Sequence, residues 1–326
     1  MGARARTLSF VLESRYRSAK FPGARIEGLY PLASVEKENT GKTGILFNRL
    51  FFRSIFSKHI RFSSNTVVHF TNQEIPPFET EAKSVVTIHD LFSVEGPSGG
   101  GIARSFYDKL IASYLRVYKR FENVIAVSDR IRKQLLELGF EGNITVIHSA
   151  VSPSFRTLRD KDGARLKLGL PQDATLVLSV STMHRRKNLD TVRRAVELLG
   201  DSYRLVRVGG SVGNSINFDV VDDETLNLLY NACDVLLFPS YDEGFGYPMV
   251  EAFAAGLPVV ASDIEIMREI SQGAALLVTP EPRACAAAVK EAIERREELA
   301  NNGLQRAKHF SMESFGGRMS SFYDSL

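Results

Sequence analysis

Residues 235–261 read VLLFPSYDEGFGYPMVEAFAAGLPVVA, and this stretch decides the expected fold. The apolar run Val235–Phe238 predicts a buried strand, and a glycine-rich loop follows it. Pro248 suits the first position of a helix and Gly256 its end, because proline is tolerated in the first helical turn and glycine ends many helices. Residues 258–261 then predict a second strand. A strand, a helix and a strand in this order predict a parallel sheet covered by helices.

The same alternation of short β-branched runs and helical patterns extends along the chain, so we expect an α/β protein with parallel sheets. One helix is expected at residues 129–138, between Ser128 as its N-cap and Gly139 as its end, and others at residues 189–199 and 312–323. The remaining strands are expected at residues 8–12, 66–70, 85–88, 124–127 and 144–147, and then at 176–180, 203–208 and 275–278.

The length of the chain favours two domains. A chain of 326 residues suits two domains of roughly 150 residues better than one large core. The segment Ser152-Pro153-Ser154, which a charged run follows, indicates the linker between them. We therefore place an N-terminal domain at residues 1–155 and a C-terminal domain at residues 156–310. The helix at residues 311–326 is expected to pack back on the first domain.

The charge of the chain is unevenly distributed. Residues 1–150 hold 21 Lys and Arg against 14 Asp and Glu, a net charge of +7, whereas residues 151–326 hold 20 against 24, a net charge of −4. A basic half favours an anionic partner such as phospholipid head groups, although ordinary surface solvation explains it equally well. The aromatic and basic residues 45–62 fit a packed helix with basic edges, or else a membrane-surface helix. We expect weak contact with anionic membranes and no nucleic-acid partner.

Several other classes of protein are disfavoured. No apolar run reaches the roughly 18 residues that span a bilayer, and the basic N-terminus lacks the apolar core of a signal peptide. We expect a cytoplasmic location, extending to the inner membrane face if the basic half binds lipid. Cys233 and Cys285 are not spaced as a metal or redox pair and should be reduced core residues. The glycine-rich residues 96–101 fit a mobile loop better than a phosphate-binding loop.

The loop after Val235–Phe238 carries the strongest functional signal. Ligands of open α/β sheets bind beyond the carboxyl ends of the strands. Gly244 and Gly246 allow the backbone to approach a ligand closely, and the first amides of the following helix form a site for a pyrophosphate. Glu243 and Glu251 would bracket the same ligand, each accepting hydrogen bonds from sugar hydroxyls. A glycine-rich turn with two solvated acids is the alternative.

Glu243 and Glu251, with seven residues between them, resemble the E-x7-E motif of the retaining glycosyltransferases of family 4. The resemblance extends to Tyr230, Ala232 and Asp234, to Pro239-Ser240 and to residues 256–262. It implies the GT-B fold, in which two Rossmann-like domains face each other across an interdomain cleft. It also implies that Glu243 contacts the donor sugar and Glu251 the ribose. The backbone amides that would hold the sugar and phosphates belong to the donor loop, which includes Gly244, Phe245, Gly246, Tyr247, Met249 and Val250.

A second group of candidate residues follows the strand at residues 176–180. Fixed cations at this edge would stabilise the negative charge of a departing diphosphate. Lys187 resembles the phosphate-binding lysine of the family, whose partner arginine often stands where this chain has Thr182. We expect Arg186 to replace that arginine, with Arg185 as the less favoured choice. A basic helix start without a ligand is the alternative.

The remaining candidates rest on the resemblance alone. His89 follows the strand at residues 85–88 and is similar to a family histidine that reaches the donor sugar or its phosphate; a buried structural histidine is the alternative. Gly209 and Gly210 follow the strand at residues 203–208, where the family receives the nucleotide base, and a plain turn is equally compatible. The first half lacks the usual glycine-rich loop after its first strand, which leaves the placement of the acceptor open.

We therefore expect a retaining, metal-independent hexosyltransferase that needs no cofactor. No Asp-x-Asp motif stands at an expected strand end to hold a metal. The partners would be a nucleotide-diphosphate sugar as donor, with GDP-mannose preferred to a UDP-sugar, and a glycan or lipid-linked acceptor. A sugar-nucleotide epimerase of similar fold and a non-catalytic partner subunit that binds sugar nucleotide are the two alternatives.

Overall fold

The computed structural model describes residues 6–10, 24–28, 66–73, 83–91, 109, 112–113 and 115–326. The chain divides into two compact units, one of Met1–His148 with Gly316–Leu326 and one of Ser149–Phe315. The sequence pattern had placed the divisions after residues 155 and 310. The segments at residues 45–62 and 96–101, for which a surface helix and a mobile loop were considered, lie outside the described residues.

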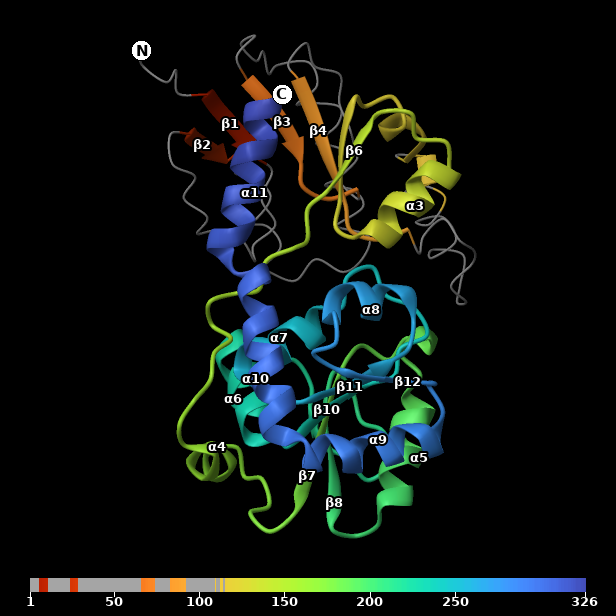
Figure 1. The fold of residues 1–326 in the computed structure, drawn as a ribbon, viewed down its shortest axis with the longest axis vertical. Coiled ribbons are helices and arrows are strands. Elements are labelled where there is room, and N and C mark those ends of the chain that lie inside the picture. Colours follow the sequence, from red (N-terminus) through yellow and green to blue (C-terminus); the bar gives the residue numbers. More distant parts are fainter. Residues whose placement is uncertain are drawn as a thin grey trace. The chain divides into compact units, whose positions relative to one another are not determined.

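The first unit contains a parallel sheet in the strand order β2-β1-β3-β4-β5-β6 (Figure 1). Phe70 and Ile88 on its central strands are fully buried. The hydroxyl of Ser128 accepts a hydrogen bond from the N–H of Ile131 at 3.2 Å, and Gly139 has a φ of +77°, so both predicted caps of α3 are confirmed. The elements are β1 (Arg6–Phe10), β2 (Ala24–Gly28), β3 (Thr66–Phe70), β4 (Lys83–Ile88), β5 (Asn123–Ala126), α3 (Asp129–Glu137) and β6 (Asn143–Val146).

The last residues of the chain, from Gly316 onward, group with the first unit. They lie in α11 (Met312–Ser325). Within the first unit the hydroxyl of Tyr323 lies 2.6 Å from Nδ1 of His69, and the guanidinium of Arg318 donates to the carbonyl of His148 at 3.4 Å. Buried Tyr323 thus joins the C-terminal helix to β3.

The second unit contains a parallel sheet in the order β12-β11-β10-β7-β8-β9. The chain runs outward from β7 to β9 and then returns to β10 on the other side of β7, so the strand order reverses between β7 and β10. The elements are α4 (Lys161–Lys167), β7 (Thr175–Val180), η2 (Arg185–Lys187), α5 (Leu189–Leu199), β8 (Tyr203–Val208), β9 (Ile216–Phe218), α6 (Asp223–Ala232), β10 (Val235–Phe238), α7 (Tyr247–Ala255), β11 (Val259–Ser262), α8 (Glu265–Ser271), β12 (Leu276–Val278), α9 (Pro282–Glu294), α10 (Arg296–Ala307) and η3 (Lys308–Phe310).

Helices cover both faces of the second sheet. Helices α5 and α9 pack together, and α7 packs against α6 and α10 (Figure 1). Val192 and Val196 of α5 join the core formed with α9 and the central strands, as the predicted three- and four-residue spacing requires. Gly200, with a φ of +88°, ends α5 where the sequence pattern predicted. The parallel strands are added outward on both sides of β7 and β10, so the helices that connect them can lie on both faces of the sheet.

Asp234 anchors the starts of β7 and β10. Its carboxylate accepts from the backbone N–H of Leu176 at 2.7 Å and from the guanidinium of Arg165 at 2.7 Å, and it also pairs with Lys161. Arg165 is itself buried and donates to the carbonyl of Ala232 at 2.9 Å. This network fixes the two strands whose opposite ends carry the predicted site.

The strand predictions are confirmed to within two residues at each end wherever a strand was expected. Two strands were missed. β9 is the short edge strand Ile216-Asn217-Phe218, whose three residues are half-buried. It is too short and too mixed in polarity to show an apolar run in the sequence. β2 reads Ala-Arg-Ile-Glu-Gly, which lacks one as well. In the described part of the chain, no helix combines the length and apolar character required to cross a membrane.

Candidate active site

The predicted donor residues lie where the second sheet reverses its strand order. Ligands of open α/β sheets bind at such a reversal, beyond the carboxyl ends of the strands. The loops that follow β7 and β10 are joined there. The backbone N–H of Tyr241 donates to the carbonyl of Arg186 at 2.8 Å, and the side-chain amide of Asn188 donates to the carbonyl of Pro239 at 3.1 Å.

Glu243 is the centre of a buried charge cluster. Its Oε1 lies 2.5 Å from Nζ of Lys187, and its Oε2 lies 3.0 Å from Nη1 of Arg186. Arg186 also donates to the carbonyl of Asp242 at 3.0 Å. Glu243 and Lys187 are buried and Arg186 is half-buried. Two cations share one carboxylate, so the three side chains carry a net charge of +1 and would attract an anion.

The pKa of Lys187 is lowered from its ordinary value of 10.5. Burial is the largest cause, because it disfavours the charged ammonium. The negative charge of Glu243 raises the pKa in return, and the positive charge of Arg186 lowers it further. The ammonium also lies 5.5 Å from the centre of the Phe238 ring, within the range of a cation–π contact. Lys187 is therefore a desolvated cation that interacts strongly with nearby charge.

A short turn orients these cations. Residues Arg185–Lys187 form a single 3-10 turn, and Nδ1 of His184 accepts from the N–H of Arg186 at 3.3 Å. Asn188 follows in the left-handed conformation, with a φ of +53°. Asparagine tolerates this conformation better than most residues, and its amide also donates to the carbonyl of Pro280 at 3.0 Å. The turn thus directs Lys187 and Arg186 toward Glu243.

The structure distinguishes the two candidate arginines. Arg186 contacts Glu243, whereas the side chain of Arg185 is exposed and so is that of Thr182. Consecutive residues of a tight turn point in different directions, and the spacing of residues in the sequence does not specify which one faces the carboxylate. The geometry favours the preferred choice of Arg186.

Glu251 lies in α7, and Tyr230 of α6 holds it. The phenol of Tyr230 donates to Oε2 of Glu251 at 2.8 Å. Tyr230 is buried, and burial together with the negative charge of Glu251 raises its pKa well above 10. The phenol is therefore a permanent donor that fixes one oxygen of the half-buried carboxylate.

The start of α7 presents backbone to the loop after β10. Gly246 has a φ of +95° and precedes the helix, and no side chain caps this N-terminus. The side chains of Phe245, Met249 and Val250 are buried in the core. Any contact of these three residues with a donor would thus involve their backbone amides. The positive φ is the reason for a glycine at position 246. Space is not the reason, because a Cβ there would meet its nearest neighbours at 3.7 Å, an ordinary contact distance.

Gly209 and Gly210 lie against the loop that follows β7. Their φ values are +97° and +115°. A Cβ on Gly209 would lie 2.3 Å from the carbonyl oxygen of Ser181, and one on Gly210 would lie 2.8 Å from Cγ of Met183. Both positions favour glycine for their conformation, and Gly209 also needs it for space, because its neighbour is backbone. The two loops are in direct contact at the same edge of the sheet.

His89 lies at the carboxyl end of β4 in the first unit. Its Nε2 lies 2.8 Å from the carbonyl of Thr71, and its backbone N–H donates to the side chain of Gln73 at 3.0 Å. Because a carbonyl only accepts, Nε2 of the half-buried ring donates in this contact. Gln73 also donates to the carbonyl of Asp90 at 3.0 Å, so it holds the loop after β4.

Four residues that were not among the predicted site residues support the site, although Tyr230 was one of those that carry the resemblance. Asn188 joins two loops, Tyr230 holds Glu251 and Gln73 orients His89. Arg207 of β8 is fully buried below the loop after β7. The sequence held a signal for two of these residues. Arg207 is a charged residue inside the apolar strand at residues 203–208, and Asn188 stands directly before the helix α5.

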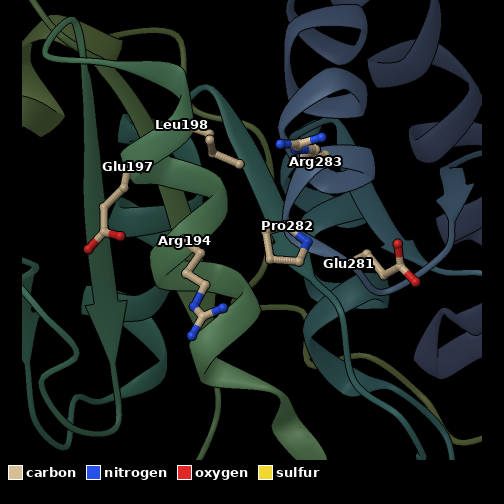
Figure 2. Close-up of a pocket in the computed structure, with 6 residues that line it drawn as sticks. All are labelled: Arg194, Glu197, Leu198, Glu281, Pro282 and Arg283. Atoms are coloured by element: carbon tan, nitrogen blue, oxygen red, sulfur yellow. The ribbon is translucent and has the colours of Figure 1, made fainter.

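A groove of about 500 Å³ lies elsewhere on the second unit, between α5 and the start of α9. Figure 2 shows the residues that line it, which are Arg194, Glu197, Leu198, Glu281, Pro282 and Arg283. None of them belongs to the predicted site. Arg194 and Glu197 pair with other residues of α5. Among the described residues, no group of three His, Cys, Asp or Glu is arranged to hold a metal ion.

Comparison with known protein families identifies the family of this chain. The model of the family described as "Glycosyl transferases group 1" matches residues 160–309, and that described as "Glycosyltransferase Family 4" matches residues 33–155. The chain belongs to the group 1 glycosyltransferases. Its fold is the GT-B fold.

Two curated relatives extend the match. The chain is 26% identical over 240 residues to the O-antigen chain mannosyltransferase RfbU of Salmonella typhimurium, covering 68% of this chain and 63% of RfbU. It is 29% identical over 240 residues to a D-inositol 3-phosphate glycosyltransferase of Nocardioides, covering 61% of this chain and 52% of that one. The chain thus spans between about half and two-thirds of these curated relatives.

One solved structure illustrates the shared fold. Anabaena HepE, solved in complex with UDP and glucose, has a TM-score of 0.71 and 17% identity to this group 1 member. The match covers 98% of this chain and 100% of HepE. At this identity the likeness establishes the fold.

Proposed function

We propose that this chain transfers a hexosyl unit from a nucleotide-diphosphate sugar to a hydroxyl of a glycan or lipid-linked acceptor, with retention of configuration at the anomeric carbon. The observation that carries the proposal is the buried cluster of Glu243, Lys187 and Arg186 beside the uncapped start of α7. A net positive, desolvated cluster and a helix N-terminus both favour a diphosphate.

The chain's own groups suffice for the chemistry we propose. The bond between the anomeric carbon and the diphosphate oxygen breaks, and Lys187, Arg186 and the first amides of α7 stabilise the charge that develops on the diphosphate. The acceptor hydroxyl attacks the same face and gives its proton to the departing phosphate oxygen. Glu243 would contact the sugar and Glu251 the ribose, while His89 would reach the sugar or phosphate. The proposed reaction needs neither a metal nor a cofactor.

GDP-mannose is the proposed donor. The relative RfbU is named a mannosyltransferase, as is the O-antigen chain mannosyltransferase B of Escherichia coli, which is 32% identical over 161 residues. A UDP-sugar is the alternative, which the UDP in the HepE structure supports. The names of these relatives also support a glycan acceptor.

A donor screen with and without acceptor tests the proposal. The chain is incubated with GDP-mannose, UDP-glucose, ADP-glucose or dTDP-rhamnose, with and without a mannose-terminated glycolipid. We expect the nucleoside diphosphate to be released at a rate that the acceptor increases, and NMR of the product to show the donor's anomeric configuration. Conversion of the donor sugar without acceptor would instead identify an epimerase. Donor binding without either reaction would identify a non-catalytic subunit.

We also propose a weak, peripheral contact with anionic membranes at the cytoplasmic side, supported by the net charge of +7 in residues 1–150. Flotation with vesicles of phosphatidylglycerol should recover the chain at low salt. Recovery should fall as salt rises, because charges are screened beyond about 10 Å at 0.1 M ionic strength. Equal recovery with vesicles of phosphatidylcholine would contradict an electrostatic contact.

A further inference from the structure

Arg207 is a buried cation that the proposed chemistry does not use. It lies on β8, and its side chain is fully buried. Three lysine or arginine side chains among the described residues are buried, and the other two have carboxylate partners: Arg165 pairs with Asp234 and Lys187 with Glu243. Within the described chain, Arg207 pairs with no carboxylate and bonds only to uncharged acceptors.

The guanidinium of Arg207 joins two loops. Its Nη1 donates to the carbonyl of Ser179 at 3.0 Å and to the hydroxyl of Ser181 at 3.1 Å, and its Nη2 donates to the carbonyl of Ser181 at 2.9 Å. Its Nε donates to the carbonyl of Gly210 at 3.2 Å. One side chain thereby fixes the loop after β7 to the loop after β8.

The joined loops lead directly to the charge cluster. Ser181 and Met183 precede the turn Arg185–Lys187 that presents Lys187 to Glu243. The backbone of Gly209 lies close to this segment, since a Cβ on Gly209 would come within 2.3 Å of the carbonyl oxygen of Ser181. A displaced Ser181 would therefore displace the cations that follow it in the chain.

The charge of Arg207 needs an explanation besides packing. Burying a cation without an anionic partner is costly, and a neutral side chain would fill a strand interior at less cost. Burial lowers the pKa of the guanidinium to about 10, so it stays protonated at neutral pH. A fixed positive charge in a low-dielectric interior attracts an anion at the surface more strongly than it would in water.

We propose that Arg207 is a positioning residue for the donor diphosphate, holding the loop that leads to Lys187 and supplying positive charge that a bound diphosphate balances. This inference rests on the proposed function. It assigns to Arg207 an effect on diphosphate affinity that acts through the loop and through its charge, and not through contact with the ligand.

The test compares Arg207→Gln with Arg207→Lys and with Arg204→Gln, an exposed arginine on the same strand. Affinities for UDP and GDP are measured by calorimetry, and affinities for uridine and guanosine by saturation-transfer NMR. We expect Arg207→Gln to weaken diphosphate binding roughly 10- to 100-fold, as for a lost hydrogen-bonded charge. Nucleoside affinity should change little. Arg207→Lys, which keeps the charge but has a single nitrogen, should lie between Arg207→Gln and the wild type, and Arg204→Gln should match the wild type.

Unchanged diphosphate affinity in Arg207→Gln would overturn the proposal. Equal losses for diphosphate and nucleoside would also overturn it, because they indicate a general structural role. If circular dichroism shows that Arg207→Gln is unfolded, the same comparison is made with Arg207→Lys. A loss of diphosphate affinity alone supports the proposal. No loss, or equal losses for diphosphate and nucleoside, overturns it. If the wild type binds neither UDP nor GDP, the proposed function fails first, and this inference fails with it.

Discussion

At the carboxyl edge of the second sheet, Glu243 holds two cations by ion pairs. At the corresponding edge of the first sheet, β3 and β4 are joined by neutral groups: Nε2 of His69 lies 2.7 Å from the hydroxyl of Thr87. Burial lowers the pKa of His69 to about 3, and the nearby His89 acts in the same direction. His69 is therefore uncharged at neutral pH.

The difference shows how one architecture supports two kinds of site. Both sheets are parallel, and each reverses its strand order once. At the second edge, Glu243, Lys187 and Arg186 form a charge cluster in which two cations share one carboxylate, and its cations favour a nearby anion. The described part of the first edge depends on hydrogen bonds between neutral groups, which orient a side chain such as His89 without attracting charge. This contrast supports our proposal that the diphosphate binds to the second unit.

Removing a cation from the carboxyl edge of the second sheet should reduce turnover more than any other change considered below. We expect Lys187→Ala and Arg186→Ala each to reduce turnover roughly 10²- to 10³-fold, the usual loss for one preorganised group. The double variant should lose less than the product of the two, because both cations stabilise the same charge. Steady-state rates with the donor identified by the screen provide the measurement.

Arg185→Ala is the matched control, since its side chain is exposed on the same turn. A damaging Arg185→Ala with a silent Arg186→Ala would reverse the assignment of the two arginines. Thr182→Arg should partly restore activity to Arg186→Ala if the loop can present a cation from that position.

Changes at Glu251 should have the next largest effect, a loss of affinity for the nucleoside diphosphate. We expect Glu251→Ala to weaken nucleoside diphosphate binding by about 1.5–3 kcal/mol, through lost hydrogen bonds to a charged group. Tyr230→Phe removes the phenol that fixes one carboxylate oxygen and should cost about 0.5–1.5 kcal/mol. Calorimetry with the diphosphate measures both. A Tyr230→Phe variant as weak as Glu251→Ala would show that the tyrosine itself contacts the ligand.

Acid should destabilise the first unit through His69. Its pKa is about 3 in the folded chain and about 6.5 when unfolded, so its contribution is complete above pH 6.5 and is lost as pH falls toward 3. At pH 5 the loss should be about 2 kcal/mol. Hydrogen exchange of the β3 and β4 amides at pH 7 and pH 5 measures it. His69→Gln should remove most of this pH dependence, and an unchanged dependence would assign it to another group.

Raising the pH should have the smallest of these effects, a gradual loss of diphosphate affinity that is slight near neutral pH. Lys187 has a lowered pKa, so it loses its charge at a lower pH than a free lysine, and diphosphate affinity should fall as pH rises toward 10.5. Lys187→Arg keeps its charge over this range and should flatten the profile, even if its affinity at pH 7 is reduced. Calorimetry between pH 7 and pH 10 compares the two proteins. The same alkaline decline in Lys187→Arg would exclude Lys187 as its cause.

The sequence by itself determined the elements and the composition of the candidate site. Apolar periodicity and caps are local properties, so α5 and the strand Val235–Phe238 were predicted with their observed bounds. The spacing of Glu243 and Glu251 and the position of Lys187 after a strand are local as well. Parallel strands bring their carboxyl ends to one edge, which is why residues 56 positions apart could be expected at one site.

Only the tertiary structure decided how these residues are held. The choice of Arg186 over Arg185 depends on the direction of a single turn. The contact of Tyr230 with Glu251 depends on how α6 and α7 pack. The burial of Arg207 depends on two loops that meet over β8. Such contacts join residues that no periodic pattern relates, because their geometry arises from packing between elements and not from the conformation of any one of them.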